Sequence, residues 1–151
     1  MRLADEAATE RLGAAIAVAL RPGEAVCLSG PLGAGKSTLA RALIRALTAP
    51  DEDVPSPTFT LVQFYEGARL KVAHFDLYRL SNPDEAYEIG LTEALDDGAA
   101  VIEWPERLAG RLPGDRLDVG IAFDEDGGLA GRRATLTPHG AWEGREVGFR
   151  S

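Results

Sequence analysis

The sequence predicts a single α/β domain with a mixed sheet that contains antiparallel hairpins and is flanked by helices. Two observations favour this class. Segments with apolar residues at helical spacing alternate with short apolar runs of strand length. The 151 residues show no internal repeat and no second core-sized segment, and 45% of them are hydrophobic, which is ordinary for a globular protein. We therefore expect one domain over residues 1–151.

The first third of the chain predicts a helix, a strand and a second helix. From Asp5, the stretch DEAATERLGAAIAVAL carries apolar residues at positions 12, 16 and 20, which predicts an amphipathic helix that ends at Pro22 and Gly23. The run AVCLSG (25–30) has strand length. A glycine-rich turn follows, and KSTLARALIRAL (36–47) predicts a helix with leucines 39, 43 and 47 on its buried side. Residues 29–38 therefore occupy a strand-to-helix corner.

The middle of the chain predicts a hairpin followed by a helix. After the acidic loop PDEDVPSP, the segments TFTLVQFYEG and ARLKVAHFDLYRL have strand character and are joined around Glu66 and Gly67. The stretch NPDEAYEIGLTEALDDG (82–98) predicts one helix, with Asn82 as its N-cap and Pro83 in its first turn.

The last third of the chain predicts three strands. AAVIEW (99–104) is a short apolar run, and LDVGIAF alternates so that positions 117, 119, 121 and 123 share one face. The turn DEDGG leads into RRATLTP (132–138), which we expect to be the antiparallel neighbour of LDVGIAF. The last ten residues have no persistent pattern, and we expect them to be loosely held.

Composition narrows the possible functions and the location. The net charge of −8 and a pI near 4.8 oppose direct binding to nucleic acid, because that affinity comes mostly from Lys and Arg on phosphates. No run approaches the roughly 18 to 20 apolar residues of a membrane span, and the N-terminus carries acids where a signal peptide is apolar. We expect a cytoplasmic protein without membrane association. The single cysteine, Cys27, is expected to be a buried filler and not a reactive thiol.

The stretch SGPLGAGKST (29–38) contains the Walker A pattern G-x-x-x-x-G-K-[ST] in its required strand-to-helix context. Small residues let the backbone N–H groups approach a phosphate, and the start of the following helix adds its positive dipole end. Only two of the sixteen cations are lysines, and Lys36 falls here because a flexible ammonium suits the β and γ phosphates. The expected nucleotide-binding residues are Gly33, Ala34, Gly35, Lys36, Ser37 and Thr38, in a domain of the P-loop NTPase type.

Carboxylates at strand ends are candidates for magnesium binding and hydrolysis. Magnesium needs a carboxylate beside the hydroxyl of Ser37, and Glu103 and Asp76 each close an apolar run. His74 shares a strand face with Asp76, so it could organise water, or it could be a half-buried sheet histidine. Thr58 follows a proline-rich loop about twenty residues after the glycine-rich turn, where GTPases keep a switch threonine.

The nucleotide and the reaction class are predicted from absences in the sequence. The usual guanine reader is Asn-Lys-x-Asp, but the one asparagine, Asn82, precedes a proline, which favours ATP over GTP. A small-molecule kinase stays an alternative, although the chain is short for a lid and an acceptor pocket, and Arg132-Arg133 is its one adjacent arginine pair. A nucleotide-gated binding module, in which hydrolysis is incidental, is a third possibility.

Five segments in this order resemble the TsaE (YjeE) family, the bacterial ATPase of tRNA threonylcarbamoyladenosine biosynthesis. They are GPLGAGKST, SPTFTLV, HFDLYRL, NPDEAYEIGL and VIEWPE, and the resemblance runs from about Asp5 to Arg133. It implies a P-loop fold with a partly antiparallel sheet, ATP and Mg²⁺ as cofactors, and association with the TsaD and TsaB subunits. Those subunits transfer a threonylcarbamoyl group to tRNAs reading codons that begin with A, so tRNA would reach this chain only through them.

The resemblance also implies residue roles. Lys36 would hold phosphates, Ser37 and Glu103 would be the magnesium ligands, Asp76 would be tied to hydrolysis and Thr58 would act like a switch. Glu6 and Arg132 would lie close to the nucleotide, and Trp104 would lie beside the magnesium ligand. A tryptophan in such a strand-to-loop corner more often serves only to pack against its neighbours. Pro31 departs from the family, which usually has a polar residue there.

Overall fold

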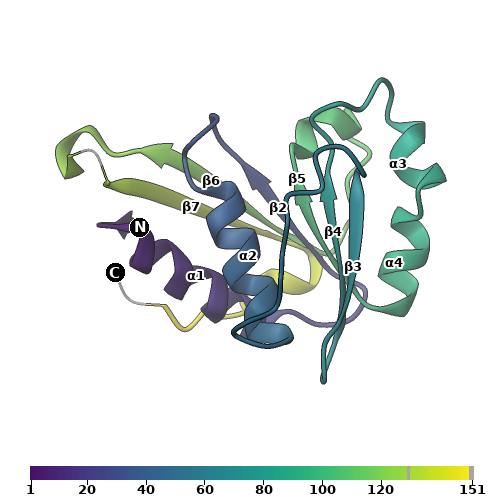
Figure 1. Cartoon of the computed structure of the whole chain (residues 1–151), viewed down its shortest axis with the longest axis horizontal. Helices are drawn as coiled ribbons and strands as arrows, with labels where there is room; N and C mark the ends of the chain where they lie inside the picture. The colour runs from purple at the N-terminus through teal and green to yellow at the C-terminus, as the bar shows by residue number, and fades with distance from the viewer. Residues whose placement is uncertain (129, 150–151) are drawn as a thin grey trace.

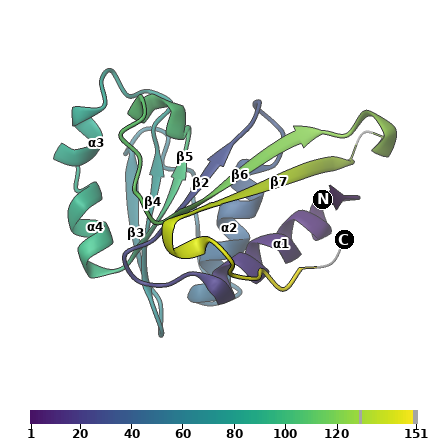
Figure 2. The ribbon, with the colours of Figure 1, turned by 180° about the vertical axis from the view of Figure 1, so that it is seen from behind.

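A seven-stranded sheet with the order β1-β7-β6-β2-β5-β4-β3 forms the centre of the molecule. The computed structural model describes residues 1–128 and 130–149. Figure 1 and Figure 2 show helices on both faces of this sheet. The elements are β1 (Arg2–Leu3), α1 (Glu6–Ala19), β2 (Ala25–Ser29), α2 (Lys36–Leu47), β3 (Val62–Glu66), β4 (Lys71–Asp76), α3 (Asp84–Glu88), α4 (Leu91–Asp97), β5 (Ala99–Glu103), η1 (Pro105–Leu108), β6 (Arg116–Phe123), η2 (Glu125–Gly127), β7 (Arg132–His139) and η3 (Gly140–Trp142).

Strand directions confirm the predicted mixed sheet. The four central strands β6, β2, β5 and β4 are parallel, whereas β3 pairs with β4 and β7 with β6 in antiparallel hairpins. Parallel strands present their carboxyl ends at the same edge of the sheet, which is where open α/β sheets bind ligands. The ends of β2, β4 and β5 therefore define one edge where a site can form.

Two hydrophobic cores lie on opposite faces of the sheet. Alternate residues of the buried strands point to each face, so Val101 belongs to the core under α1 and α2, and Ile102 belongs to the core under α3 and α4. The predicted helix stripes are confirmed, because Leu12, Ile16 and Leu39 are fully buried in the first core. In the described part of the chain, no helix combines the length and apolar character that a membrane span requires.

The prediction of one helix over residues 82–98 is wrong, because the segment forms two short helices, α3 and α4. Gly90 lies between them with φ +106°, a left-handed conformation that ends one helix and precedes the next. Pro83 occupies the cap position and not the first turn. The Asn82 side chain nevertheless accepts a hydrogen bond from the Asp84 N–H at 3.0 Å, as a capping residue does.

The end of the chain also differs from the expectation that it is loosely held. Trp142 is fully buried in the first core, and Val147 and Phe149 pack against that core. Arg145 makes a bidentate ion pair with buried Glu24, with N···O distances of 2.6 and 2.7 Å. Positions 150 and 151 lie outside the described residues. This segment completes the core beneath α1, which local sequence patterns do not reveal.

Two further differences lie in the part of the sheet formed by β1, β7 and β6. The two residues of β1 pair with β7, opposite Arg132 and Arg133, and two residues are too few to produce a sequence pattern. Phe123 continues the alternation of β6 but is 51% exposed, and as the last residue of this strand it belongs to neither hydrophobic core. The guanidinium of Arg132 lies 4.6 Å from the centre of its ring.

Truncating Trp142 tests whether the final segment stabilises the fold. We expect Trp142→Ala to lower the free energy of unfolding by about 3–5 kcal/mol, as for other large buried side chains. Urea unfolding monitored by circular dichroism measures the change. Val18→Ala is the matched control because Val18 is 82% exposed, and it should leave the free energy nearly unchanged. A loss for Trp142→Ala as small as the control's would show that the segment contributes little.

Cys27 is predicted to be inert towards thiol reagents in the folded protein. It lies buried on β2, and burial, with a further contribution from the charge of Asp118, raises its pKa to about 12. Labelling by an aromatic disulfide should therefore be slow and should rise little from pH about 7 to about 9, where an ordinary thiol ionises. Urea should make the thiol react at once. Rapid labelling of native protein would contradict this burial.

Candidate functional site

The glycine-rich loop (residues 29–38) joins β2 to α2 as predicted. Gly30 and Gly35 have φ values of +141° and +113°, which side chains rarely adopt. A Cβ atom on Gly30 would also collide with the carbonyl oxygen of Ile121 on the neighbouring strand. The loop conformation therefore depends on glycine at these positions, and it places the N-terminus of α2 at the edge where the parallel strands end.

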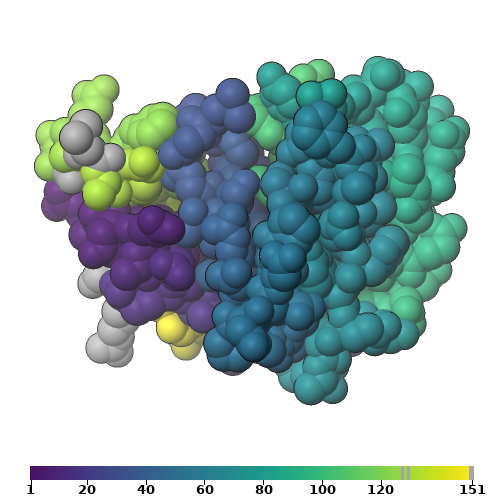
Figure 3. All heavy atoms as spheres, viewed as in Figure 1, coloured from purple at the N-terminus to yellow at the C-terminus, as the bar shows by residue number. Residues whose placement is uncertain are grey.

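A pocket of about 360 Å³ opens beside this loop. One wall is the loop and the start of α2, and the other is the segment before β3 together with the ends of β4 and β5. In the space-filling view, the blue loop region and the teal segment stand on either side of a notch (Figure 3). The lining residues are Pro31, Leu32, Gly33, Gly35, Lys36, Ser37, Thr38, Ser56, Thr58, Asp76, Tyr78, Glu103 and Trp104.

Lys36 is largely buried in this pocket. Its ammonium group donates hydrogen bonds to the carbonyl oxygens of Gly30 and, at 3.3 Å, Pro31, and it lies 4.0 Å from the centre of the Trp104 ring. Burial lowers the pKa of Lys36, and the nearby carboxylates of Glu103, Glu106 and Asp76 oppose this effect. Within residues 1–128 and 130–149, no carboxylate forms a direct ion pair with this ammonium group. An anionic ligand in the pocket can therefore replace neutral partners of Lys36.

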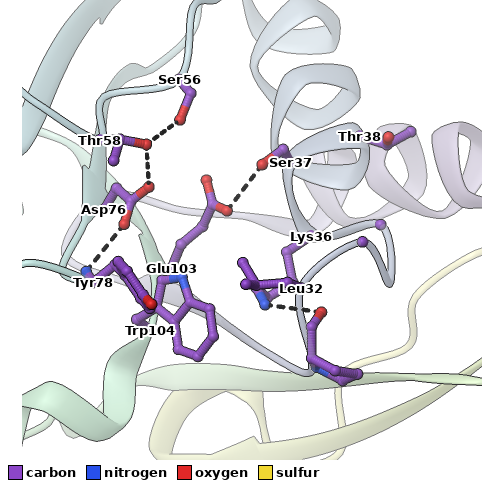
Figure 4. Close-up of a pocket in the computed structure, with 13 residues that line it drawn as sticks. Leu32, Lys36, Ser37, Thr38, Ser56, Thr58, Asp76, Tyr78, Glu103 and Trp104 are labelled. Carbon is purple, nitrogen blue, oxygen red and sulfur yellow. Dashed lines mark hydrogen bonds between the residues drawn. The ribbon is translucent and has the colours of Figure 1, made fainter.

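Ser37 and Glu103 meet at the base of the pocket. The hydroxyl of Ser37, in the first turn of α2, donates to Glu103 Oε1 at 3.2 Å (Figure 4). Glu103 is the last residue of β5, and its register partners are Leu28 on β2 and Asp76 on β4. The sheet thus brings together the two residues that the resemblance implies as magnesium ligands, although 66 positions separate them in the chain.

Thr58 and Asp76 form a second hydrogen-bonded group on the opposite wall. The Thr58 hydroxyl donates to Asp76 Oδ2 at 3.1 Å, and the Tyr78 N–H donates to Asp76 Oδ1 at 3.0 Å. Ser56 lies 2.7 Å from the Thr58 hydroxyl, which extends the chain of contacts toward solvent (Figure 4). Asp76 is therefore oriented by two donors while its carboxylate lines the pocket.

The chemistry of the donors fits a magnesium ion carried with a nucleotide. Mg²⁺ in phosphate-binding sites is held by one or two carboxylates or hydroxyls, with phosphate oxygens and water completing its coordination. Ser37 and Glu103 supply one hydroxyl and one carboxylate within contact of each other. Among the described residues, no group of three or more His, Cys, Asp or Glu side chains is arranged to hold a metal alone. A magnesium ion held by Ser37 and Glu103 would have further coordination positions for phosphate oxygens and water.

Glu6 and Arg132 lie on the other side of the glycine-rich loop. They line a second pocket of about 230 Å³, which shares Gly33, Gly35 and Thr38 with the first. Arg132 donates to the carbonyl oxygens of Ala34 at 3.1 Å and Gly33 at 3.3 Å. The loop thus separates the predicted site residues into two groups, with Ser37, Asp76 and Glu103 on one side. Thr38 points away from Ser37 (Figure 4). The second pocket is lined by Glu6, Thr9, Gly33, Ala34, Gly35, Thr38, Ala130 and Arg132.

Several residues of the site were not predicted from the sequence. Tyr78 lines the first pocket, and its ring centre lies 5.0 Å from that of Trp104. Its position two residues after Asp76 was an available signal. Ser56, two residues before Thr58, could have been found in the same way. Leu32 is 70% exposed at the rim and carries no chemical signal in the sequence.

His74 does not line the pocket. It is buried, not half-buried, and its Nε2 lies 2.6 Å from Glu103 Oε2. The expectation that it shares a face with Asp76 agrees with their alternate positions on β4 and with the burial of both residues. Its contact is with the far oxygen of Glu103, so His74 lies behind this carboxylate and not beside a ligand in the pocket.

Known proteins with the same features identify the family. Residues 3–134 match the family model described as threonylcarbamoyl adenosine biosynthesis protein TsaE. The chain is similar to proteins described as tRNA threonylcarbamoyladenosine biosynthesis protein TsaE from Rickettsia felis, at 37% identity over 82% of this chain and 73% of that protein, and from Nostoc sp., at 36% identity over 90% and 83%.

A solved structure agrees with this match. The crystal structure of Bacillus subtilis YdiB has a TM-score of 0.76 and 27% sequence identity, and the match covers 95% of this chain and 87% of that one. The shared architecture is a P-loop NTPase-like α/β fold. Since the family model spans most of the chain and relatives above 30% identity cover more than two thirds of it, this chain belongs to the TsaE family of threonylcarbamoyl adenosine biosynthesis proteins.

Proposed function

We propose that the protein is a Mg²⁺-dependent ATPase required for threonylcarbamoyladenosine modification of tRNAs that read codons beginning with A. Membership of the TsaE family supports the process. The observation that carries the ATPase proposal is the convergence of three elements on one pocket: Lys36 and Ser37 come from α2, Glu103 from β5 and Asp76 from β4. The protein would act in the cytoplasm, as the composition predicts.

Each side chain has a role that its position supports. Lys36 would exchange its carbonyl partners for the β and γ phosphate oxygens, joined by the backbone N–H groups of the loop from Gly33 to Thr38. Ser37 and Glu103 would hold magnesium, which when bound neutralises charge that develops on the phosphates. Asp76, oriented by Thr58, would accept a proton from the attacking water or position it. Glu6 and Arg132 would contact the nucleotide from the second pocket.

The partners would be the TsaD and TsaB subunits, with tRNA bound through them. The net charge of −8 supports an indirect contact with tRNA, because a strongly acidic protein repels phosphates. Leu32, which is exposed and lines the first pocket, and Phe59, which is exposed and follows Thr58 of that lining in the chain, are candidate contacts for these subunits. Hydrolysis of ATP would drive the cycle of the transferase complex after each modification.

The test is ATP hydrolysis by the purified chain with Mg²⁺, alone and with the matching TsaD–TsaB pair and tRNA. We expect slow turnover alone, a changed rate with the pair, and repeated rounds of adenosine modification in the same tube. If the pair alters neither hydrolysis nor modification, the proposal fails. A metabolite that raises ADP release in proportion to a phosphorylated product would then establish the alternative, a small-molecule kinase.

A further inference from the structure

His74 is the buried partner of the Glu103 carboxylate. It is 2% exposed on β4, and its register partner on the parallel strand β5 is Val101. Glu103 lies two residues beyond Val101, so its side chain is on the same face of the sheet, where the imidazole reaches it. His74 Nε2 lies 2.6 Å from Glu103 Oε2, so the carboxylate oxygen that faces the protein interior has a hydrogen-bond partner.

The two oxygens of Glu103 have different partners. Oε1 accepts from the Ser37 hydroxyl at 3.2 Å on the pocket side, and Oε2 faces His74 on the interior side. A glutamate side chain has three rotatable bonds, and a buried carboxylate with an unpaired oxygen is costly. Since Glu103 is itself only 2% exposed, the contact with His74 both satisfies Oε2 and keeps Oε1 on the side of Ser37.

The hydrogen-bond partners of the two ring nitrogens indicate which nitrogen of His74 carries the proton. His74 Nδ1 is buried and has no hydrogen-bond partner among the described residues. An imidazole nitrogen without a proton is an acceptor. Burying an unpaired acceptor costs less free energy than burying an unpaired N–H donor. The arrangement favours the tautomer with the proton on Nε2, which then donates to Glu103 Oε2.

We propose that His74 is a positioning residue for the magnesium site, donating from Nε2 to Glu103 Oε2 so that Oε1 stays available to the cation beside Ser37. This inference rests on the proposed function, because it needs Glu103 to be a metal ligand. Partners that orient a ligating side chain typically change metal affinity by about 10- to 100-fold when removed. His74 itself touches neither nucleotide nor metal.

Three substitutions separate hydrogen bonding from packing. In His74→Gln the side-chain amide N–H₂ stands close to the place of imidazole Nε2, so it can donate to Glu103. His74→Asn is shorter and places its amide near Nδ1, out of reach of the carboxylate. His74→Leu fills space without any donor. Positioning predicts that Gln keeps the function and that Asn and Leu lose it, whereas packing alone predicts no such order.

The experiment measures the dissociation constant of a non-hydrolysable ATP analogue with Mg²⁺ and with EDTA, using isothermal titration calorimetry. The ratio of the two constants gives the contribution of the metal to binding. We expect His74→Leu and His74→Asn to reduce this ratio by about 10- to 100-fold while binding in EDTA changes by less than about twofold. His74→Gln should retain most of the ratio. His74→Leu should add nothing in a Glu103→Gln background, because the ligand is already lost.

The outcomes distinguish this inference from the proposed function. A wild-type Mg²⁺ effect that survives in His74→Leu overturns the inference alone. So does an equal loss in all three variants accompanied by weaker binding in EDTA, which indicates a general role in folding. Circular dichroism confirms the fold of each variant, and if His74→Leu is unfolded the Gln and Asn pair decides. If the wild-type chain binds the analogue with the same dissociation constant in Mg²⁺ and in EDTA, the proposed magnesium site is wrong, and the inference about His74 fails with it.

Discussion

Replacing Lys36 with alanine is expected to lower kcat/KM for ATP hydrolysis at least about a hundredfold, as the loss of one preorganised charge-stabilising donor does elsewhere. The ammonium group of Lys36 is buried in the pocket and is bonded to the carbonyl oxygens of Gly30 and Pro31. We expect phosphate oxygens of the nucleotide to replace these two carbonyl partners. Steady-state hydrolysis, with nucleotide affinity measured separately, tests the effect on each step.

The matched control is Lys71→Ala, which removes the chain's only other lysine. Lys71 is half-exposed, pairs with Asp97 at 3.2 Å and is not part of the pocket lining, because it lies at the opposite end of β4 from Asp76. Exposed pairs of this kind contribute little, so activity should be unchanged. Lys36→Arg should not restore activity, since a planar guanidinium cannot take the place of a compact ammonium. An alanine variant with wild-type turnover would refute the phosphate role of Lys36.

Asp76→Asn is expected to lower kcat by about 10²- to 10⁴-fold, the usual contribution of a positioned general base, with ATP affinity nearly unchanged. The amide keeps the size of the side chain and can still accept from the Tyr78 N–H, which lies 3.0 Å from Oδ1. It loses the charge that would take the proton of the attacking water. Single-turnover hydrolysis and equilibrium binding of ATP separate these two effects.

Asp97→Asn is the control for this substitution, since Asp97 is an exposed carboxylate at the end of α4. Adenosine modification by the full complex should be followed with both variants. An Asp76→Asn protein that hydrolyses ATP normally would show that the assigned role is wrong. One that cannot hydrolyse ATP but sustains repeated modification would instead favour a nucleotide-gated binding module.

The elements that sequence patterns predicted correctly are those with strong local signals. The strand, glycine-rich turn and helix over residues 25–47 combine an apolar run, a glycine pattern and leucines at helical spacing. The hairpin around Glu66 and Gly67 has two strand-like segments and a turn between them. Each of these elements is confirmed because its pattern lies within a short stretch of the chain and agrees with its tertiary environment.

The elements that were predicted wrongly, or not predicted at all, lack a strong local signal in the sequence. The break between α3 and α4 occurs at Gly90, and a single glycine within a helical pattern does not by itself predict a break. Trp142 is isolated in a segment without periodicity, yet it is fully buried under α1. The strand β1 is only two residues long, and the pairing partner that defines it lies about 130 positions away.

The site divides in the same way. The phosphate-binding role of residues 30–38 was predicted from the spacing of their residue types. The two carboxylates that close β4 and β5 were selected as candidates because a magnesium ion bound with phosphate needs a carboxylate. That Ser37 contacts Glu103, and Thr58 contacts Asp76, required the strands to be placed side by side. Their catalytic and binding roles stay predictions.

The sequence by itself determined the fold class, the glycine-rich strand-to-helix turn and the family, because patterns of residue type along the chain identify these features without knowledge of contacts between distant segments. Only the tertiary structure decided which oxygen of Glu103 faces the pocket and which faces His74, and that Glu6 and Arg132 lie across the loop from the other site residues. The physical reason is that strand order and register set these contacts, and they arise from packing the whole sheet and both cores together.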